Sequence, residues 1–453
     1  MAVIMRSVSA VRSQGVPGRL AAGAREEQVA PEHVLAARCG WGESGRGIAV
    51  VFWRLRRGPG RETPVSSAAP AGRPRGGLSR RQALAGFGIA LIGGVSAPAA
   101  GARAAVAPAR HARAGLAAGL TNLQLAGQRV IGSYPGLTPP ASLFTDISNG
   151  QVAGVIFFGE NISSETQIAG VITHLRQAQA QSPVQVPLLL MTDQEGGLVR
   201  RLPGQPVLSE KQIGQSSDPV AAAAAAGTGA GQNLAGAGMN VNLAPVLDVY
   251  YKPGNFIDQY QRSYSHDPAV VFACGQAFIT AQQQAGVAAT AKHFPGLGSA
   301  AKNQDTDGGP VTLTVSLTKL HTLDEVPYPA AVGAGVKLVM VSWAIYPALD
   351  ATRPAGLSPA VIGQELRGRN AFTGVTITDA LEAGALSAFG AAGQRAVAAA
   401  GAGMDLILCS ARDVSQGEAA TAALASALGS GQLDPAAFNA AVNRVTALRA
   451  GLF

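Results

Sequence analysis

The chain has 453 residues and a formal net charge of +8, but that charge is concentrated at one end. Residues 1–104 carry 15 Arg, no Lys and five Glu, whereas residues 105–453 carry 20 basic and 22 acidic side chains. This distribution excludes a basic nucleic-acid-binding domain, and an aromatic content of 5% argues against stacking platforms for single-stranded nucleic acid.

The first part of the chain, residues 1–78, is rich in Arg, Gly, Ala and Pro and shows no sustained hydrophobic period. Such a composition cannot bury enough apolar surface to form a core. We therefore expect residues 1–78 to be disordered, or to be an extension that arises from an upstream start codon.

Residues 79–104 have the three-part layout of a secretory signal. Arg80 and Arg81 precede an apolar run over 85–100, and a small-x-small site follows at 102–104. The adjacent arginines predict a signal peptide of the twin-arginine type and export of the rest of the chain. The run is too short and too weakly apolar to span a bilayer, and no Cys follows it, so no stable membrane anchor is expected. A surface helix with two arginines is the alternative.

The exported part, residues 105–453, contains eight short apolar runs that alternate with Ala-rich stretches. Most runs are apolar at successive positions, which is typical of strands buried on both faces. The runs are 129–134, 155–158, 188–192, 241–249, 287–292, 338–343, 375–378 and 405–409. Helices are expected over 165–181, 221–236, 269–284 and 435–452. This alternation predicts a single (β/α)8 TIM-type barrel, with a doubly wound sheet as the alternative.

Polar side chains follow three of the expected strands directly. Asp193 follows one strand, Lys292 and His293 end a second, and Asp379 follows a third. Catalytic residues of barrel enzymes sit at these strand ends, and buried charges there need a partner or a function. Carboxylates beside cations suit a polyhydroxylated ligand and supply the groups that glycoside hydrolysis needs. Ion pairs that close the top of the barrel are the alternative.

Four stretches, in this order, resemble the signatures of glycoside hydrolase family 3. They are residues 193–202 (DQEGGLVRRL), 262–268 (RSYSHDP), 292–298 (KHFPGLG) and 374–381 (GVTITDAL). Together they span the predicted barrel, and four ordered motifs are far more specific than any one of them.

The resemblance implies a role for individual residues. Asp379 falls on the family's nucleophile, which forms a covalent glycosyl-enzyme with retention of the β configuration. The positions that fall on the family's sugar-binding residues are Asp193, Arg201, Arg262, Lys292 and His293. Neighbouring Lys and Arg side chains are expected to lower the pKa of Asp379 and so keep it ionised.

No second α/β domain follows the eighth run, so the chain resembles the single-domain β-N-acetylhexosaminidase branch of the family. In that branch a loop after K-H-F-P-G carries D-S-H, whose His is the proton donor. Here the loop over 298–310 has no His, and Asp307 stands in its place with Asp305 two residues before it. Asp307 is thus the candidate acid/base and Asp305 its partner. The alternative is that both aspartates are solvated turn residues.

The expected function is hydrolytic removal of a terminal β-linked sugar from an oligosaccharide substrate, and the favoured sugar is N-acetylglucosamine. A β-glucosidase-like specificity and a catalytically silent sugar-binding barrel are the alternatives. No metal or organic cofactor is implied, since two carboxylates and a water suffice, and no cysteine has zinc-ligand spacing.

Three further residues carry minor expectations. Asp248 ends the fourth strand and is expected to orient an Arg or Lys. Trp343 ends the sixth strand and either stacks on a sugar face or packs in the core. His321 has no partner in the sequence and is expected to be a surface or helix residue.

Overall fold

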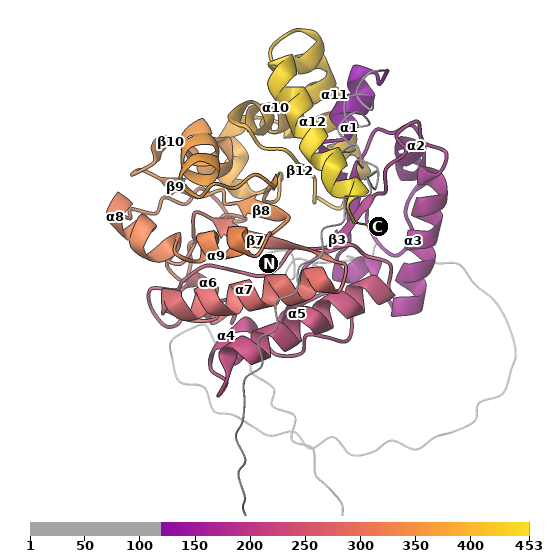
Figure 1. Ribbon diagram of the computed structural model, residues 1–453. Helices are drawn as coiled ribbons and strands as arrows, with labels where there is room; N and C mark the ends of the chain where they lie inside the picture. The colour runs from indigo at the N-terminus through magenta and orange to yellow at the C-terminus, as the bar shows by residue number, and fades with distance from the viewer. Residues whose placement is uncertain (1–118, 453) are drawn as a thin grey trace, which may run out of the picture. The chain divides into compact units, whose positions relative to one another are not determined.

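The computed structural model describes residues 119–452. The expectations for residues 1–78 and 79–104, and the start of the domain at residue 105, therefore lie outside the described residues. Within the described part, eight strands form one parallel sheet (Figure 1). They are β1 (Val130–Gly132), β2 (Gly154–Ile156), β3 (Leu189–Thr192), β6 (Val241–Asn242), β7 (Ala288–Phe294), β8 (Leu338–Val341), β11 (Val375–Thr378) and β12 (Ile407–Leu408).

The sheet closes on itself. Its order is β11-β8-β7-β6-β3-β2-β1-β12, and every neighbouring pair is parallel. The last seam is made by Leu406, directly before β12: its N–H donates to Thr376 O at 2.9 Å, and its carbonyl accepts the N–H of Thr378 at 3.0 Å. The predicted (β/α)8 barrel is confirmed. The doubly wound sheet is wrong, because such a sheet would leave β11 and β12 as unpaired edges.

The fourth strand is shorter than its apolar run predicted. β6 ends at Asn242, seven residues before the expected end at Val249. Pro245 interrupts the ladder because it has no N–H to donate. The chain rejoins the sheet just beyond it, where the N–H of Leu247 donates to Lys292 O at 2.6 Å.

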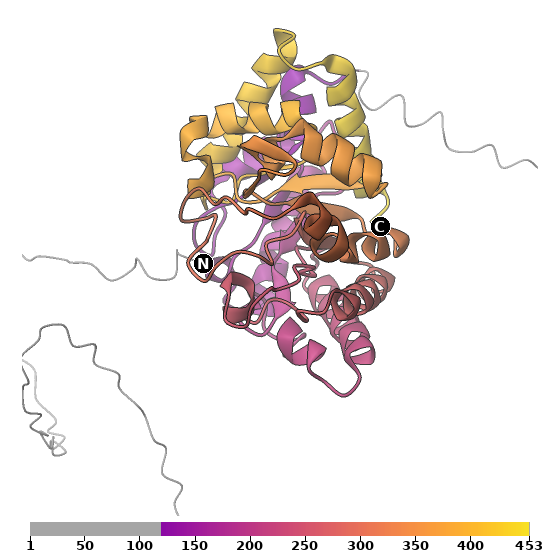
Figure 2. The same cartoon turned by 90° about the vertical axis from the view of Figure 1, so that its left-hand side faces the viewer.

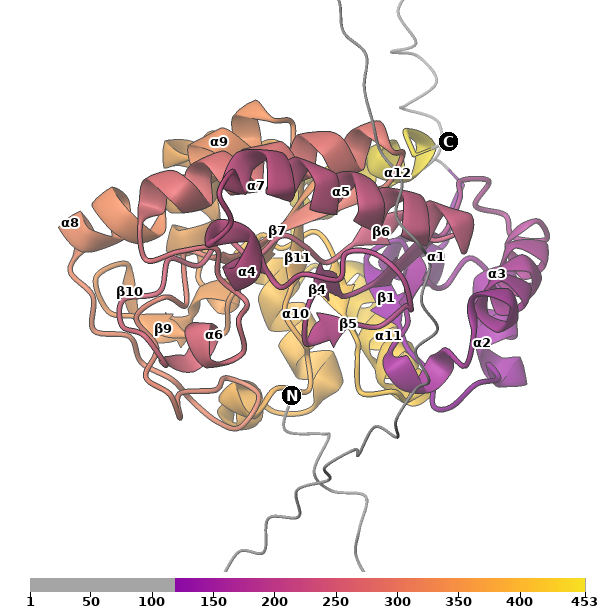
Figure 3. The ribbon, with the colours of Figure 1, turned by 90° about the horizontal axis from the view of Figure 1, so that it is seen from below.

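A helix follows each strand around the barrel. These helices are α2 (Ala141–Ser148), α3 (Glu165–Gln179), α5 (Pro219–Gly236), α7 (Pro268–Gln284), α9 (Pro327–Gly333), the π-helical segment η5 (Ala360–Arg369), α10 (Ala392–Ala402) and α11 (Val414–Gly429). α5 and α7 run alongside each other (Figures 1 and 3). Glycine allows this approach: a Cβ on Gly227 would lie 2.3 Å from Phe278 O. No helix in the described range is long and apolar enough to cross a membrane.

The remaining elements are short, apart from the last helix, α12 (Pro435–Ala450). The short helices are α1 (Asn122–Gly127), η2 (Gly159–Asn161), α4 (Glu210–Gly214), α6 (Phe256–Gln259), α8 (Leu317–Lys319), η3 (Leu320–Asp324), η4 (Ala355–Leu357) and η6 (Gly384–Phe389). Two small hairpins pair β4 (Gln194–Gly196) with β5 (Val199–Arg200), and β9 (Ile345–Tyr346) with β10 (Asp350–Pro354). The first hairpin directly follows β3, so it lies where the sequence predicts the site.

The interior of the barrel is filled by apolar side chains from the strands, and α12 joins that core through Val445 and Leu448. Arg449, only 1% exposed, donates to the carbonyls of Pro187 at 2.6 Å and Val186 at 2.9 Å, directly before β3. The C-terminal helix α11 also lies beside the first described helix, α1 (Figures 1 and 2). These contacts secure the N-terminal end of the strands and leave the opposite end for chemistry.

Candidate active site

The residues predicted from strand ends do meet at one mouth of the barrel. Asp193 follows β3, Lys292 and His293 lie near the end of β7, and Asp379 follows β11. The carboxyl ends of parallel strands all face the same end of a barrel. Arg262, from the loop after α6, reaches the same place and lies 3.4 Å from His293 (Nη2 to Nε2).

Lys292 occupies the centre of a buried charge cluster. Its Nζ lies 2.8 Å from Asp193 Oδ1 and 2.7 Å from Glu195 Oε1. Arg262 donates to both oxygens of Glu195, from Nε and Nη2, at 2.9 Å each. Glu195 thus balances two cations while only 1% exposed. Burial would raise the pKa of Glu195, but Arg262 and Lys292 outweigh burial and hold it below its ordinary value.

Asp193 and Arg201 form the more open side of this cluster. Burial would raise the pKa of Asp193, but Lys292 and Arg201 together lower it. The backbone N–H of Arg201 donates to Asp193 O at 3.3 Å, and its side-chain Nε is buried without a hydrogen bond to the described residues. An ionised acceptor beside a buried donor that lacks a bond is suited to a ligand rich in hydroxyl groups.

His293 is held by Asp248, from the segment that follows β6. His293 Nδ1 lies 2.8 Å from Asp248 Oδ2, and Asp248 Oδ1 accepts the backbone N–H groups of His293 at 3.3 Å and Leu297 at 2.7 Å. An ionised carboxylate here fixes the hydrogen on Nδ1 and leaves Nε2 toward Arg262. The expectation that Asp248 orients an Arg or Lys is wrong: its contacts go to the imidazole and the loop backbone.

Asp379 is half-buried at the end of β11, and its Oδ1 accepts the N–H of Ala380 at 2.8 Å. Burial and the carboxylate of Asp307 raise its pKa, although His293 and Lys292 lower it. The expectation of a lowered pKa for Asp379 is therefore wrong. The physical reason is that burial, together with the charge of Asp307, outweighs the opposing charges of His293 and Lys292.

The loop that carries the candidate acid is tied to the segment that follows Asp379. Gly384 N–H donates to Asp307 O and Ala385 N–H donates to Thr306 O, both at 3.0 Å. The Asp305 carboxylate accepts the N–H of Asp307 at 3.0 Å, which fixes the turn. The Asp307 residue is exposed, yet its carboxylate lies near enough to raise the pKa of Asp379. The structure thus brings the two candidate catalytic carboxylates to one place.

Trp343 lies behind the candidate nucleophile. It is fully buried, and its indole Nε1 donates to Ala380 O at 2.8 Å. A Cβ on Gly356 would lie 2.5 Å from its ring, which shows how closely the backbone packs on it. Trp343 is therefore a core residue that supports the peptide after Asp379, and the sugar-stacking alternative is wrong.

Sequence reasoning missed the roles of Glu195 and Glu210. Glu195 stands inside the first motif, and its spacing of two residues from Asp193 was the available signal. Glu210 begins α4 with no such signal. It is 1% exposed, its Oε1 accepts the N–H of Val246 at 2.8 Å, and its Oε2 is buried without a hydrogen bond to the described residues. Burial and the charge of Glu195 raise its pKa well above its ordinary value, which favours a neutral carboxyl behind the site.

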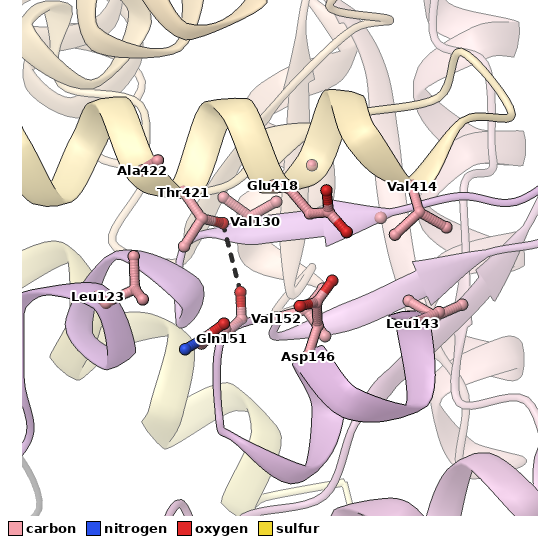
Figure 4. A pocket seen from close by; sticks show the side chains of 12 residues that line it. Leu123, Val130, Leu143, Asp146, Gln151, Val152, Val414, Glu418, Thr421 and Ala422 are labelled. Carbon is pink, nitrogen blue, oxygen red and sulfur yellow. Dashed lines mark hydrogen bonds between the residues drawn. The ribbon is translucent and has the colours of Figure 1, made fainter. Parts of the chain in front are cut away.

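A separate cavity of about 170 Å³ lies on the outer wall of the barrel, between β1, α2 and α11 (Figure 4). Asp146 from α2 and Glu418 from α11 both line it among apolar side chains. Burial, and then the charge of Glu418, raise the pKa of Asp146 from its ordinary value of 3.8 to about 6. None of the predicted site residues lines this cavity.

Replacement of Asp146 is expected to change how stability depends on pH. A raised pKa means that the folded chain binds the proton more tightly than the unfolded chain, so the free energy of unfolding falls as pH rises from about 4 to about 6. Asp146→Asn should remove that fall and be more stable than wild type at pH 7. Urea unfolding at pH 4.5 and pH 7 measures the difference in free energy of unfolding between Asp146→Asn and wild type, with Glu165→Gln as a surface control. A difference of the same size at both pH values would contradict the prediction.

The closed barrel, with paired carboxylates and cations at the C-terminal ends of its strands, defines an enzyme that hydrolyses glycosidic bonds. The model of the glycosyl hydrolase family 3 N-terminal domain matches residues 125–448. The chain therefore belongs to glycoside hydrolase family 3, as its four motifs predicted.

Relatives and solved structures agree with this assignment. An "uncharacterized secreted glycosyl hydrolase" of Arthroderma benhamiae is 47% identical over 72% of this chain and 93% of its own length. The beta-hexosaminidase A of Pseudoalteromonas piscicida is 31% identical over 70% of this chain, and this chain spans only 56% of it. A family 3 beta-N-acetylglucosaminidase from Paenibacillus sp. FPU-7 superposes with a TM-score of 0.69 at 36% identity, covering 74% of this chain and 63% of that one.

Proposed function

We propose that this glycoside hydrolase is an exported, retaining β-N-acetylhexosaminidase that acts through a covalent intermediate on Asp379. The observation that carries the proposal is the pair of hydrogen bonds, from Gly384 N–H to Asp307 O and from Ala385 N–H to Thr306 O, that tie the Asp307 loop to the segment after Asp379, at the mouth that holds Asp193 and Lys292. Two carboxyl groups near one sugar are what retaining hydrolysis needs. The hexosaminidase specificity draws on the relatives that carry that name.

The proposed reaction has two steps. In the first, an Asp379 oxygen attacks the anomeric carbon while the Asp307 carboxyl gives its proton to the leaving oxygen, which forms the glycosyl-enzyme and frees the alcohol. In the second, Asp307 takes a proton from water, and the water oxygen displaces Asp379 with a second inversion. Asp305 positions Asp307 by accepting its N–H.

The charge cluster would bind the sugar at its hydroxyl groups. Asp193 accepts hydrogen bonds as an ionised carboxylate, and Arg201 and Lys292 donate them. His293 would present its Nε2 to the sugar, because Asp248 Oδ2 holds its Nδ1 at 2.8 Å. Hydrogen bonds from fixed, already paired charges need little reorganisation as positive charge develops at the anomeric carbon.

Export is part of the proposal. Residues 79–104 have the composition of a twin-arginine-type signal peptide, and the fungal relative is named a secreted protein. An oligosaccharide with a terminal β-linked N-acetylglucosamine is the proposed substrate.

The test compares two aryl glycosides. The purified chain is assayed with aryl β-N-acetylglucosaminide and with aryl β-glucoside, beside its Asp379→Ala variant. Turnover of the first substrate alone, lost in the variant, is the expected result. Turnover of the glucoside alone would establish a β-glucosidase-like specificity, and turnover of neither by the folded protein would indicate a silent sugar-binding barrel.

Asp307→Asn is expected to separate substrates by their leaving groups. Hydrolysis of a chitobiose-type substrate, whose alcohol leaves poorly, should slow by about 10²- to 10⁴-fold, whereas formation of the glycosyl-enzyme from an activated aryl glycoside should slow much less. Steady-state kinetics with the two substrates measures the difference.

The matched control is Asp305→Asn. Because Asp305 acts on the loop backbone, its loss should affect both substrates equally. Equal slowing of both substrates by Asp307→Asn would exclude Asp307 as the acid/base.

A further inference from the structure

Three metal-ligating side chains converge outside the proposed active site. His321 lies in η3 and Glu325 follows that segment, four residues later on one helical face. Glu365 lies in the middle of η5, the π-helical segment on the other side of β8 along the chain. One potential ligand atom from each of these residues lies within 4.8 Å of the other two. The cluster thus joins the segments that enter and leave β8.

The atoms that face one another lack well-directed hydrogen bonds. His321 Nε2, Glu325 Oε1 and Glu365 Oε1 are all buried without a hydrogen bond of good direction among the described residues, although the Glu325 and Glu365 carboxyl groups interact directly. His321 Nε2 lies only 2.9 Å from Glu365 Oε1, but the contact does not have the direction of a hydrogen bond. Glu325 is only 1% exposed, so its carboxyl group is removed from bulk solvent. Buried polar atoms of this kind normally have a partner.

The second oxygen of Glu325 is held in place by neighbours. Its Oε2 accepts the side-chain N–H of Asn370 at 2.9 Å and of Arg369 at 3.4 Å. Bonds to the outer oxygen of a carboxylate orient its other oxygen, as outer partners do for metal ligands. Oε1 is thereby directed toward the imidazole and Glu365.

Arg369 is the competing cation. Its Nε lies 2.9 Å from Glu365 Oε1, and its side chain is 43% exposed. This exposed side chain can turn to solvent when a divalent cation binds, because the cation would then balance the charge of the buried carboxylates in its place. A closed ion-pair network around Arg369 is the competing explanation, and it predicts the opposite response to removal of Arg369.

We propose that His321, Glu325 and Glu365 bind a divalent transition-metal cation of the zinc type. One imidazole nitrogen and two carboxylate oxygens are common zinc ligands, and bonds of about 2.0–2.2 Å place such ligand atoms about 3–4 Å apart. The cation would cross-link the segments on either side of β8 and would stabilise the barrel wall. It has no part in the proposed hydrolysis, so neither proposal depends on the other.

The test measures metal binding directly. The full chain is freed of metal with a chelator and titrated with Zn²⁺ by calorimetry, and with Co²⁺ by visible absorption. Wild type should bind one more ion than Glu365→Gln or His321→Asn, or bind it at least about ten-fold more tightly. Zn²⁺ should also raise the Tm of wild type and not that of these variants. Any zinc bound elsewhere on the chain is common to all of them.

Two further variants separate the explanations. Glu165→Gln removes an exposed carboxylate from α3 and should bind as wild type does. Arg369→Gln should bind Zn²⁺ at least as tightly as wild type, because it removes the competing charge. Zinc binding that is equal in wild type, Glu365→Gln and His321→Asn would overturn the proposal, as would a lower Tm in Arg369→Gln that Zn²⁺ fails to restore. His321, a quarter exposed, gives a variant that should fold even if Glu365→Gln does not.

Discussion

Asp379→Ala is expected to lower kcat/KM for an aryl β-N-acetylglucosaminide on the order of 10⁴-fold, because it removes the atom that would form the covalent intermediate. No neighbouring group can replace it. Asp193 and Glu195 are held by Lys292, and Asp307 belongs to the loop on the leaving-group side in the proposed mechanism. Steady-state kinetics with both aryl substrates measures the loss.

A second substitution at Asp379 should separate loss of activity from loss of folding. Burial and Asp307 raise the pKa of Asp379, so the folded chain bears the cost of an ionised carboxylate there at neutral pH. Asp379→Asn should therefore be inactive yet at least as stable as wild type at pH 7, and its advantage should shrink as pH falls. Retention of more than about a tenth of wild-type activity in a folded variant would rule out Asp379 as the nucleophile.

Glu195→Gln is expected to cause the largest loss of stability. Lys292 is 1% exposed, and it and Arg262 would both lose the negative charge that they contact at 2.7 and 2.9 Å. Removing one partner of a buried ion pair costs about 3–5 kcal/mol, because the remaining charge stays buried. Urea unfolding at pH 7 measures this loss in the free energy of unfolding. The matched control is Glu160→Gln, whose carboxylate is 45% exposed and lies 3.5 Å from Arg412, and which should cost under about 1 kcal/mol.

The pH dependence of this loss has a definite sign. The pKa of Glu195 is lowered in the folded chain, so its stabilising contribution is fully present above the ordinary pKa of 4.5 and disappears as pH falls below it. The difference between wild type and Glu195→Gln should therefore shrink as pH falls below about 4.5. A deficit independent of pH would indicate that Glu195 acts through packing alone.

The barrel was predictable because its strands are buried on both faces and so appear as continuous apolar runs, as β3 and β7 do. The run over 241–249 was overextended, since its apolar residues continue past the point where Pro245 breaks the ladder. Closure could not be read from the sequence, because it depends on Leu406 meeting β11 in space.

Much of the site was predictable from strand ends and motifs, but its electrostatics were not. The sign of the pKa shift at Asp379 depends on how far its carboxylate is buried and on the approach of Asp307, and only the structure shows either. Glu210 and Asp248 were missed or misjudged for the same reason, because their partners come from distant segments. The assigned roles of Asp379 and of the sugar-binding residues stay predictions until the variants are measured.

The indole that supports the candidate nucleophile also gives the enzyme an internal optical probe. Trp343 is the sole tryptophan between residues 119 and 452, and it is joined through the carbonyl of Ala380 to the peptide whose N–H holds Asp379. Tryptophan emission reports polarity and hydrogen bonding at the ring, and the two other tryptophans, Trp41 and Trp53, belong to the N-terminal segment. In a chain from which Trp41 and Trp53 have been removed, the fluorescence of this single ring would be a local signal of the state of the nucleophile's backbone, available without any label.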